Sequence, residues 1–223
     1  PLRPRASAPV APGSGGAVTW KGWVMNLVFD VGNVLIRWAP ERAVAHVFPD
    51  PAEGLAWMQS VGFFAWNVVQ DGGRGFAEGL AVIEAEHPGA ASVLAAYPQR
   101  FGLTIEEAIE GTWSLIAQLR ARGHRLLAIT NFAAYTWPVA LDLHPRLATS
   151  FEDVVVSGHE KLLKPGAAIY ELLCARNGLR AGDCLFIDDS AANVEGARAV
   201  GMAAHHFTTP EALEQDLAAR GLI

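Results

Sequence analysis

The stretch Met25-Asn-Leu-Val-Phe-Asp30-Val-Gly-Asn-Val34 decides the fold class, because it holds a short apolar run that ends in a carboxylate. Similar short runs recur at residues 124–130, 151–156 and 184–188, and the last of these also ends in carboxylates. Four to six apolar residues bounded by turns are typical of strands that are buried on both faces of a sheet. A shorter stretch around His205-His206 predicts one more strand.

Helix signals fill the segments between these runs. Thr104-Ile-Glu-Glu107 predicts a capping box at the start of a helix that ends at Gly123. Residues 167–177 and 191–200 each precede a glycine, and Thr209-Pro210-Glu211 predicts the start of a last helix. The alternation predicts an α/β protein with a Rossmann-like, doubly wound parallel sheet.

Two segments depart from the alternation. Residues 40–103 contain no convincing strand and are rich in aromatic and aliphatic residues, which predicts a small helical cap inserted after the first strand. The hydrolase-like core would then consist of residues 25–39 and 104–223. Residues 1–24 hold four prolines and three glycines in their first sixteen positions, so we expect a flexible N-terminal tail.

Composition excludes several classes of protein. The chain of 223 residues carries 17 Lys and Arg against 23 Asp and Glu, which gives a net charge of −6 and argues against a partner that is nucleic acid or an anionic membrane. No apolar run approaches the ~18 residues of a membrane span. Two cysteines without a CxxC pattern favour a reducing, cytoplasmic location.

Polar residues follow the predicted strands where those strands end. They are Asp30, Thr130, Asn131, Lys164, Asp188 and Asp189. Each of them alone is most simply a turn former, a helix cap or a solvated side chain. Ligands of open parallel sheets bind beyond the carboxyl ends of the strands, so the whole set at one edge indicates a binding site.

This set of residues is suited to phosphoryl transfer. Three carboxylates in one crevice repel each other and call for a cation, and ligation by oxygen alone suits Mg²⁺. Asp30 would be both a metal ligand and the nucleophile that forms an aspartyl-phosphate. The Thr130 hydroxyl and nearby backbone amides would hold the phosphate, and Lys164 would neutralise its charge.

The sequence resembles the haloacid dehalogenase superfamily of hydrolases from Met25 onward. The resemblance is carried by four motifs in order: Asp30-Val-Gly-Asn-Val34, Ile129-Thr130-Asn131, Lys164-Pro165, and Ile187-Asp188-Asp189-Ser190 with Asn193. It implies that Asp30, the Gly32 carbonyl and Asp189 bind magnesium, with Asp188 as a further ligand, direct or through water. It also implies that Asn131, Gly32 and Asn33 contact the substrate and that Ser190 and Asn193 support the metal site.

One position departs from that family. Most of its phosphatases carry a second aspartate, as acid and base, where this chain has Gly32. The chain could be inactive, a dehalogenase, or one of the phosphatases with glycine there, which include sugar-1-phosphate phosphatases. A dehalogenase needs no metal, and without one Asp188 and Asp189 would repel each other. Arg37 could serve such an enzyme by binding the halide, so that alternative stays open.

The cap offers one dense polar cluster, Trp66-Asn-Val-Val-Gln-Asp71-Gly-Gly-Arg74, which could face the substrate or form a turn. Trp38 is expected to pack in the core rather than line the pocket. The sequence names no residue that activates water.

We therefore predict a magnesium-dependent phosphatase, monomeric or homodimeric, with a small phosphorylated metabolite, possibly a sugar phosphate, as its substrate. A metal-independent dehalogenase and a non-catalytic phosphate-binding module are the alternatives.

Overall fold

The computed structural model describes residues 25–223, and the predicted tail (1–24) lies outside the described residues. Five parallel strands form one sheet in the order β3-β2-β1-β4-β5. The strands are β1 (Asn26–Phe29), β2 (Arg125–Thr130), β3 (Val154–Val156), β4 (Cys184–Asp188) and β5 (Ala203–His206). All five were predicted, and the Rossmann-like α/β fold is confirmed. Because the strands are parallel, the segments that carry Asp30, Asn131 and Asp189 leave the sheet at one edge.

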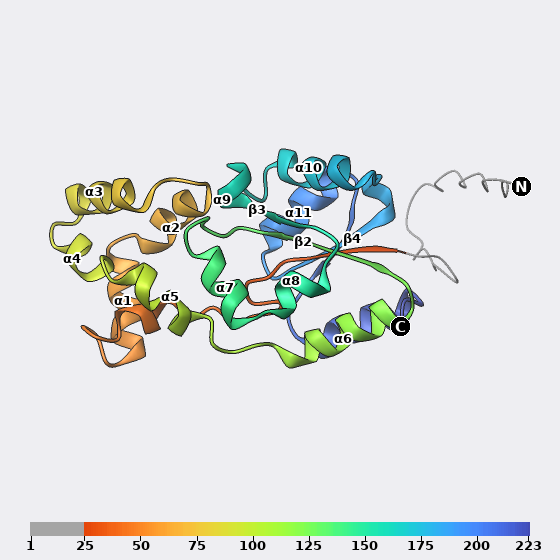
Figure 1. Cartoon of the computed structure of the whole chain (residues 1–223), viewed down its shortest axis with the longest axis horizontal. Coiled ribbons are helices and arrows are strands. Elements are labelled where there is room, and N and C mark those ends of the chain that lie inside the picture. The colour runs from red at the N-terminus through yellow and green to blue at the C-terminus, as the bar shows by residue number, and fades with distance from the viewer. Residues whose placement is uncertain (1–24) are drawn as a thin grey trace, which may run out of the picture.

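Alternating side chains of each strand enter two separate hydrophobic clusters. Leu27 and Phe29 of β1 face one cluster, whereas Val28 faces the other. The first cluster includes α6 (Glu110–Ala121) and α12 (Pro210–Ala219), and the second includes α10 (Ala167–Asn177) and α11 (Ala191–Ala199). Figure 1 shows α10 and α11 above the sheet and α6 below it. Burial on both faces explains why the strands are continuously apolar.

Short elements complete the core. They are α7 (Trp137–Leu143), α8 (Arg146–Ser150), α9 (Ser157–Glu160) and the 3₁₀ helix η2 (Ala181–Asp183). As the sequence predicts, α10 ends at Gly178 and α12 begins after Thr209, whose side chain accepts a hydrogen bond from the Ala212 amide. Among residues 25–223, no helix combines the length and the apolar character that a membrane span requires.

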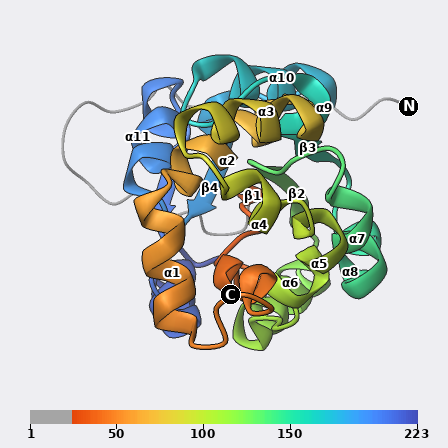
Figure 2. The ribbon, with the colours of Figure 1, turned by 90° about the vertical axis from the view of Figure 1, so that its left-hand side faces the viewer.

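A layer of helices precedes α6, and we call these helices the cap. They are the 3₁₀ helix η1 (Pro40–Val44), α1 (Pro51–Ser60), α2 (Phe63–Asp71), α3 (Phe76–Glu86), α4 (Ala90–Leu94) and α5 (Tyr97–Thr104). Residues 40–103, all of them described, contain no strand, as predicted. In Figure 2 these helices lie in front of the ends of the strands. The cap therefore stands over the edge of the sheet at which β1 ends.

The predicted capping box at Thr104 is wrong. Thr104 is the last residue of α5, and its hydroxyl donates to the Phe101 carbonyl. The chain then returns from the cap to the core in extended form, because the Arg37 amide donates to the Glu107 carbonyl at 2.9 Å and the Ile109 amide to the Leu35 carbonyl at 2.8 Å. This pairing uses the residues that the box needs, so α6 begins only at Glu110.

Gly158, in α9, allows a close approach of two backbone segments. A Cβ atom there would lie 2.7 Å from the Phe132 carbonyl oxygen and closer still to the Ala134 amide nitrogen. We expect Gly158→Ala to lower the free energy of unfolding by ~1–3 kcal/mol, because backbone atoms cannot move aside as side chains can. Gly182→Ala, at an exposed position with space for a methyl group, is the matched control. Equal urea midpoints for the two variants would contradict the packing argument.

Candidate active site

Asp30 directly follows β1 and is held at the edge of the sheet by its backbone. Its amide donates to the Ile187 carbonyl at 2.8 Å, and its Oδ1 accepts a hydrogen bond from the Val31 amide at 2.7 Å. Burial raises the pKa of Asp30 to about 7, against the lowering effect of Lys164 and with further raising by Asp188 and Asp189. The site thus concentrates more negative charge than its own cation compensates.

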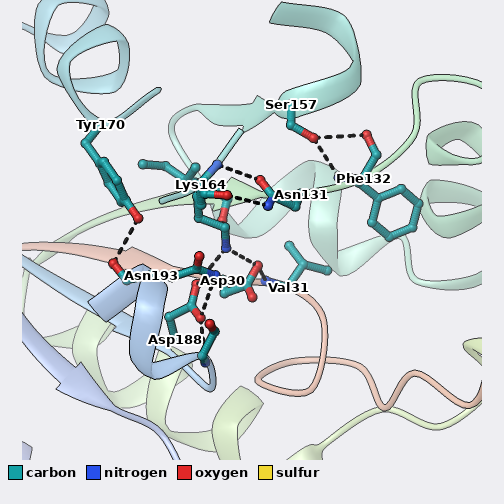
Figure 3. A network of polar contacts seen from close by, with 11 residues as sticks. Asp30, Val31, Asn131, Phe132, Ser157, Lys164, Tyr170, Asp188 and Asn193 are labelled. Carbon is teal, nitrogen blue, oxygen red and sulfur yellow. Dashed lines mark hydrogen bonds and ion pairs between the residues drawn. The ribbon is translucent and has the colours of Figure 1, made fainter. Parts of the chain in front are cut away.

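Lys164 is the cation of the site, and its ammonium lies between two carboxylates. Nζ is 2.7 Å from Asp30 Oδ1, 2.6 Å from Asp188 Oδ2 and 3.1 Å from the Ile129 carbonyl oxygen (Figure 3). Burial lowers the lysine pKa, but the two carboxylates outweigh it and the pKa is raised, so the side chain is charged. Lys164 therefore positions Asp30 and neutralises part of its charge.

Asn131 fixes the backbone of Lys164. Its Nδ2 donates to the Lys164 carbonyl at 3.0 Å, and its Oδ1 accepts from the Lys164 amide at 2.9 Å. Both ends of the Asn131 amide are thus engaged, although the residue lines the cavity above Asp30. Thr130 is 1% exposed at the end of β2 and does not line that cavity. Contact of Thr130 and Asn131 with phosphate stays a prediction, and the structure shows a positioning contact for Asn131.

Asp188 is fully buried and its carboxylate is surrounded by donors. The Ser190 amide donates to Oδ1 at 2.8 Å, and the Asn193 amide group lies 3.0 and 3.1 Å from the two oxygens (Figure 3). Tyr170 supports this arrangement, because its hydroxyl donates to the Asn193 carbonyl at 2.9 Å. Together with Lys164 on Oδ2, these contacts engage both oxygens of Asp188, which does not line the cavity. Asp188 is therefore better placed to orient the neighbouring groups of the site than to contact a substrate.

Asp189 has the opposite orientation, because it lines the cavity beside Asp30. Its pKa is raised, first by burial and then by Asp188, and a hydrogen bond from Asn33 lowers it. Asn33 adopts a left-handed φ of 53° and accepts a hydrogen bond from the Trp38 amide at 3.0 Å. The loop after β1 is therefore folded so that Gly32 and Asn33 line the same cavity as Asp189.

The three carboxylates form a site suited to a divalent cation. Asp30, Asp188 and Asp189 each offer an oxygen, and these atoms lie within 4.8 Å of one another. Three acidic groups around a single lysine carry more negative charge than the lysine balances, so a further positive charge stabilises them. Ligation by oxygen alone favours Mg²⁺, so the donor set fits the predicted ion.

A cavity of about 340 Å³ opens above these groups, between the edge of the sheet and the cap. Asp71, at the end of α2, lines it together with Asp30. Burial raises the pKa of Asp71 to about 7, a backbone hydrogen bond from Ala133 lowers it, and Asp30 adds to the rise. The Ser157 hydroxyl donates to the Asp71 carbonyl at 2.6 Å and so fastens α2 to the core.

Several residues in or beside the cavity were missed from the sequence or were predicted there only as one of two alternatives. For the cluster that contains Asp71, the sequence favoured a substrate-facing role and a turn equally. Its neighbour Trp66 has a structural role, since its indole donates to the Gly79 carbonyl at 2.7 Å. Trp38, predicted as core, lines the cavity while stacking on Phe63. Ser157 carries no motif, and only its position directly after β3 could have drawn attention to it. Arg37 is exposed, pairs with Glu107 at 3.2 Å, and does not line the cavity.

Comparison with known proteins identifies the family. A family model for haloacid dehalogenase-like hydrolases matches residues 24–201. The chain belongs to this family. A sesquiterpene phosphatase of Aspergillus oryzae, astK, is 30% identical over 95 residues, which are 43% of this chain and 48% of that protein. The match thus spans about half the length of this curated relative.

Solved structures of the family share the fold. The bt-2542 enzyme of Bacteroides thetaiotaomicron, in complex with magnesium and inorganic phosphate, aligns with a TM-score of 0.66 at 19% identity over 84% of this chain and 96% of that one. The L-2-haloacid dehalogenase of Xanthobacter autotrophicus aligns with a TM-score of 0.63 at 17% identity over 88% and 83%. At these identities the likeness establishes the fold of this hydrolase but not its reaction.

The raised pKa of Asp71 predicts a specific dependence of stability on pH. The folded protein keeps a proton on Asp71 up to a higher pH than the unfolded protein does. Between pH ~4 and ~7 the free energy of unfolding of the wild type therefore falls, because the buried carboxyl group has to ionise. Asp71→Asn removes that cost. We expect the free energy of unfolding of the variant, relative to wild type, to rise across this pH range in EDTA. A difference that is constant with pH in urea titrations would contradict the raised pKa.

Proposed function

We propose that the protein is a magnesium-dependent phosphatase that hydrolyses a small phosphorylated compound through an aspartyl-phosphate on Asp30. The observation that carries the proposal is the buried cluster of Asp30, Lys164 and Asp188, with Asp189 beside it, of which Asp30 and Asp189 line the floor of the cavity. The phosphatase named among its relatives and the family member solved with magnesium and phosphate support the same chemistry.

Each residue of the cluster has a distinct task in this proposal. The Asp30 oxygen attacks phosphorus, and Lys164 offsets the charge that gathers on the nucleophile and the phosphoryl oxygens. Asp30, Asp189 and the Gly32 carbonyl would hold Mg²⁺, with Asp188 behind them, and the bound ion would supply further charge neutralisation at the phosphate. Asn131 holds the backbone of Lys164 and Asn193 holds Asp188, so both groups stay oriented during turnover.

The dehalogenase alternative is less well supported by these contacts. The predicted halide residue, Arg37, lies away from the cavity in an exposed ion pair with Glu107. Asp188 and Asp189 also place two adjacent acids where metal-independent chemistry has no use for them. Halide release from 2-chloropropionate in EDTA remains the direct measurement for this alternative.

Hydrolysis of para-nitrophenyl phosphate tests the proposal, because its easy leaving group makes the least demand on a proton donor. We expect turnover with Mg²⁺ that excess EDTA abolishes. Asp30→Asn should lower kcat by more than about a thousandfold while the circular dichroism spectrum is unchanged. Asp142→Asn, at an exposed position of α7, is the control. Turnover by Asp30→Asn close to wild type would refute the nucleophile, and phosphate binding without turnover would indicate a binding module.

A further inference from the structure

The cavity has two chemically different ends. Its floor, at the edge of the sheet, is polar and carries Asp30, Asn131 and Asp189. Its walls under the cap are apolar and largely aromatic, and they include Trp38, Phe64, Val68, Phe101, Ile105 and Phe132. Phe101 and Phe132 pack edge to face with their centroids 5.4 Å apart, so this wall is a continuous aromatic surface. A phosphate on the floor would therefore place its organic group against apolar walls.

The walls offer few partners to hydroxyl groups. No Lys, Arg or His of the described residues lines this cavity. The Asn67 side chain already donates to Asp71 at 3.0 Å, and the Thr136 hydroxyl already donates to the Ala133 carbonyl at 3.1 Å. The hydroxyls of Tyr97 and Tyr135 and the Asp71 carboxylate are the other polar groups of the walls, and the Tyr97 hydroxyl is buried without a hydrogen-bond partner among the described residues. A sugar carries hydroxyls on every face, and each one that is buried here without a partner would cost free energy. An apolar group would instead gain from leaving water.

We propose that the substrates are phosphate monoesters of apolar alcohols or phenols, with a small hydrocarbon group that fills the cap end of the cavity. This proposal rests on the proposed phosphatase function and specifies the substrate class of the same site. The volume of about 340 Å³ lies at the lower end for ligand sites, which fits a compact ring or a short branched chain. Sugar phosphates, the possibility raised by the sequence, become the competing outcome of the test.

Cyclohexylmethyl phosphate and glucose 6-phosphate form a suitable pair of probes. Both present a six-membered ring and a primary alcohol as leaving group, so they differ mainly in hydroxyl groups and in the ring oxygen. We expect kcat/KM to be at least ~100-fold higher for the cyclohexylmethyl ester, because the hydroxyls of glucose outnumber the polar groups of the walls and some of them lose water without gaining partners. Equal values, or a preference for glucose 6-phosphate, would overturn the apolar assignment and leave the phosphatase function intact.

Calorimetric binding to Asp30→Asn separates the two proposals. This variant should bind the cyclohexylmethyl ester at least ~100-fold more tightly than glucose 6-phosphate, with or without turnover by the wild type. Absence of magnesium-dependent turnover of every ester, para-nitrophenyl phosphate included, would refute the phosphatase function. Weak binding of both esters, or tighter binding of the sugar ester, would refute the apolar assignment.

Two neighbouring valines of α2 provide a matched pair of variants. Val68 lines the cavity, Val69 does not, and their exposed fractions are 49% and 47%. We expect Val68→Asn to reduce the preference for the cyclohexylmethyl ester by ~10-fold, because a polar group then stands in the apolar wall. Val69→Asn should leave the preference at its wild-type value. The same effect from both variants would show that the cavity wall does not select the substrate.

A second observation concerns proton transfer. Gly32 brings no side chain to the cavity, and the Asp30 carboxylate is engaged by Lys164. Asp71 is the cavity-lining carboxylate that belongs to the cap rather than to the metal cluster. One of its oxygens accepts from Asn67, and its backbone is fastened by Ser157. It thus approaches the cavity from the side on which a leaving group would lie.

We propose that Asp71 is the catalytic acid that protonates the leaving oxygen. As the Asp30 oxygen bonds to phosphorus, the bond from phosphorus to the ester oxygen breaks with its electron pair on that oxygen, and the Asp71 proton converts it to the alcohol. The charged and titratable groups that act on or are affected by Asp71 are Asp30, Lys164, Tyr97 and Tyr135. Its pKa of about 7 leaves a useful fraction protonated near neutral pH.

The dependence on the leaving group tests this role. Asp71→Asn should lower kcat/KM for cyclohexylmethyl phosphate by at least ~100-fold, and for para-nitrophenyl phosphate by less than tenfold, because nitrophenolate leaves without a proton. Because kcat/KM reports only the steps up to and including the first irreversible one, the later hydrolysis of the phosphoenzyme does not affect this ratio. Glu78→Gln, an exposed cap carboxylate, is the control. Equal losses for both esters would assign Asp71 a structural role and overturn the proposal.

Discussion

The contact between the Lys164 ammonium and the two carboxylates of Asp30 and Asp188 is the interaction on which the site depends. All three groups are buried, and the lysine nitrogen lies 2.6 and 2.7 Å from the two carboxylates, so removal of the lysine would leave two buried negative charges without a countercharge. Such unpaired buried charges cost several kcal/mol. The lysine also donates to the Ile129 carbonyl, which ties the cluster to β2. Segments after β1 and β3 and the end of β4 thereby converge on one nitrogen atom.

The parallel sheet makes this convergence possible. β1 lies in the centre of the sheet, between β2 and β4, so the residues that follow these three strands emerge side by side. The faces of the sheet are filled by hydrophobic clusters, and only its edge is left for polar side chains. A cluster of like charges can persist there because the surrounding backbone amides, such as those of Val31 and Ser190, are already directed at the carboxylates.

The floor of the site could be predicted from the sequence because parallel strands bring their ends together without any knowledge of side-chain packing. Asp30 and Asp188 follow from that rule alone. The capping box at Thr104 failed because a tertiary pairing of Glu107 with Arg37 overrides a local signal. The cavity wall could not be predicted, because Phe64 and Phe101 come from separate cap helices and an aromatic residue in a helix looks the same in a core as at a pocket.

The apolar walls and the acidic floor are two parts of one physical arrangement. Low polarity around the cavity deprives ionised carboxylates of hydration, which is why burial is the largest cause of the raised pKa of both Asp30 and Asp71. The same low polarity favours a hydrocarbon group on the substrate and disfavours a sugar. A hydrocarbon alcohol is a poor leaving group, so a cavity that selects it also creates the need for a proton donor. Asp71 lies in the cap, which supplies much of the apolar wall, so one insertion in the fold can provide both substrate selection and the proton.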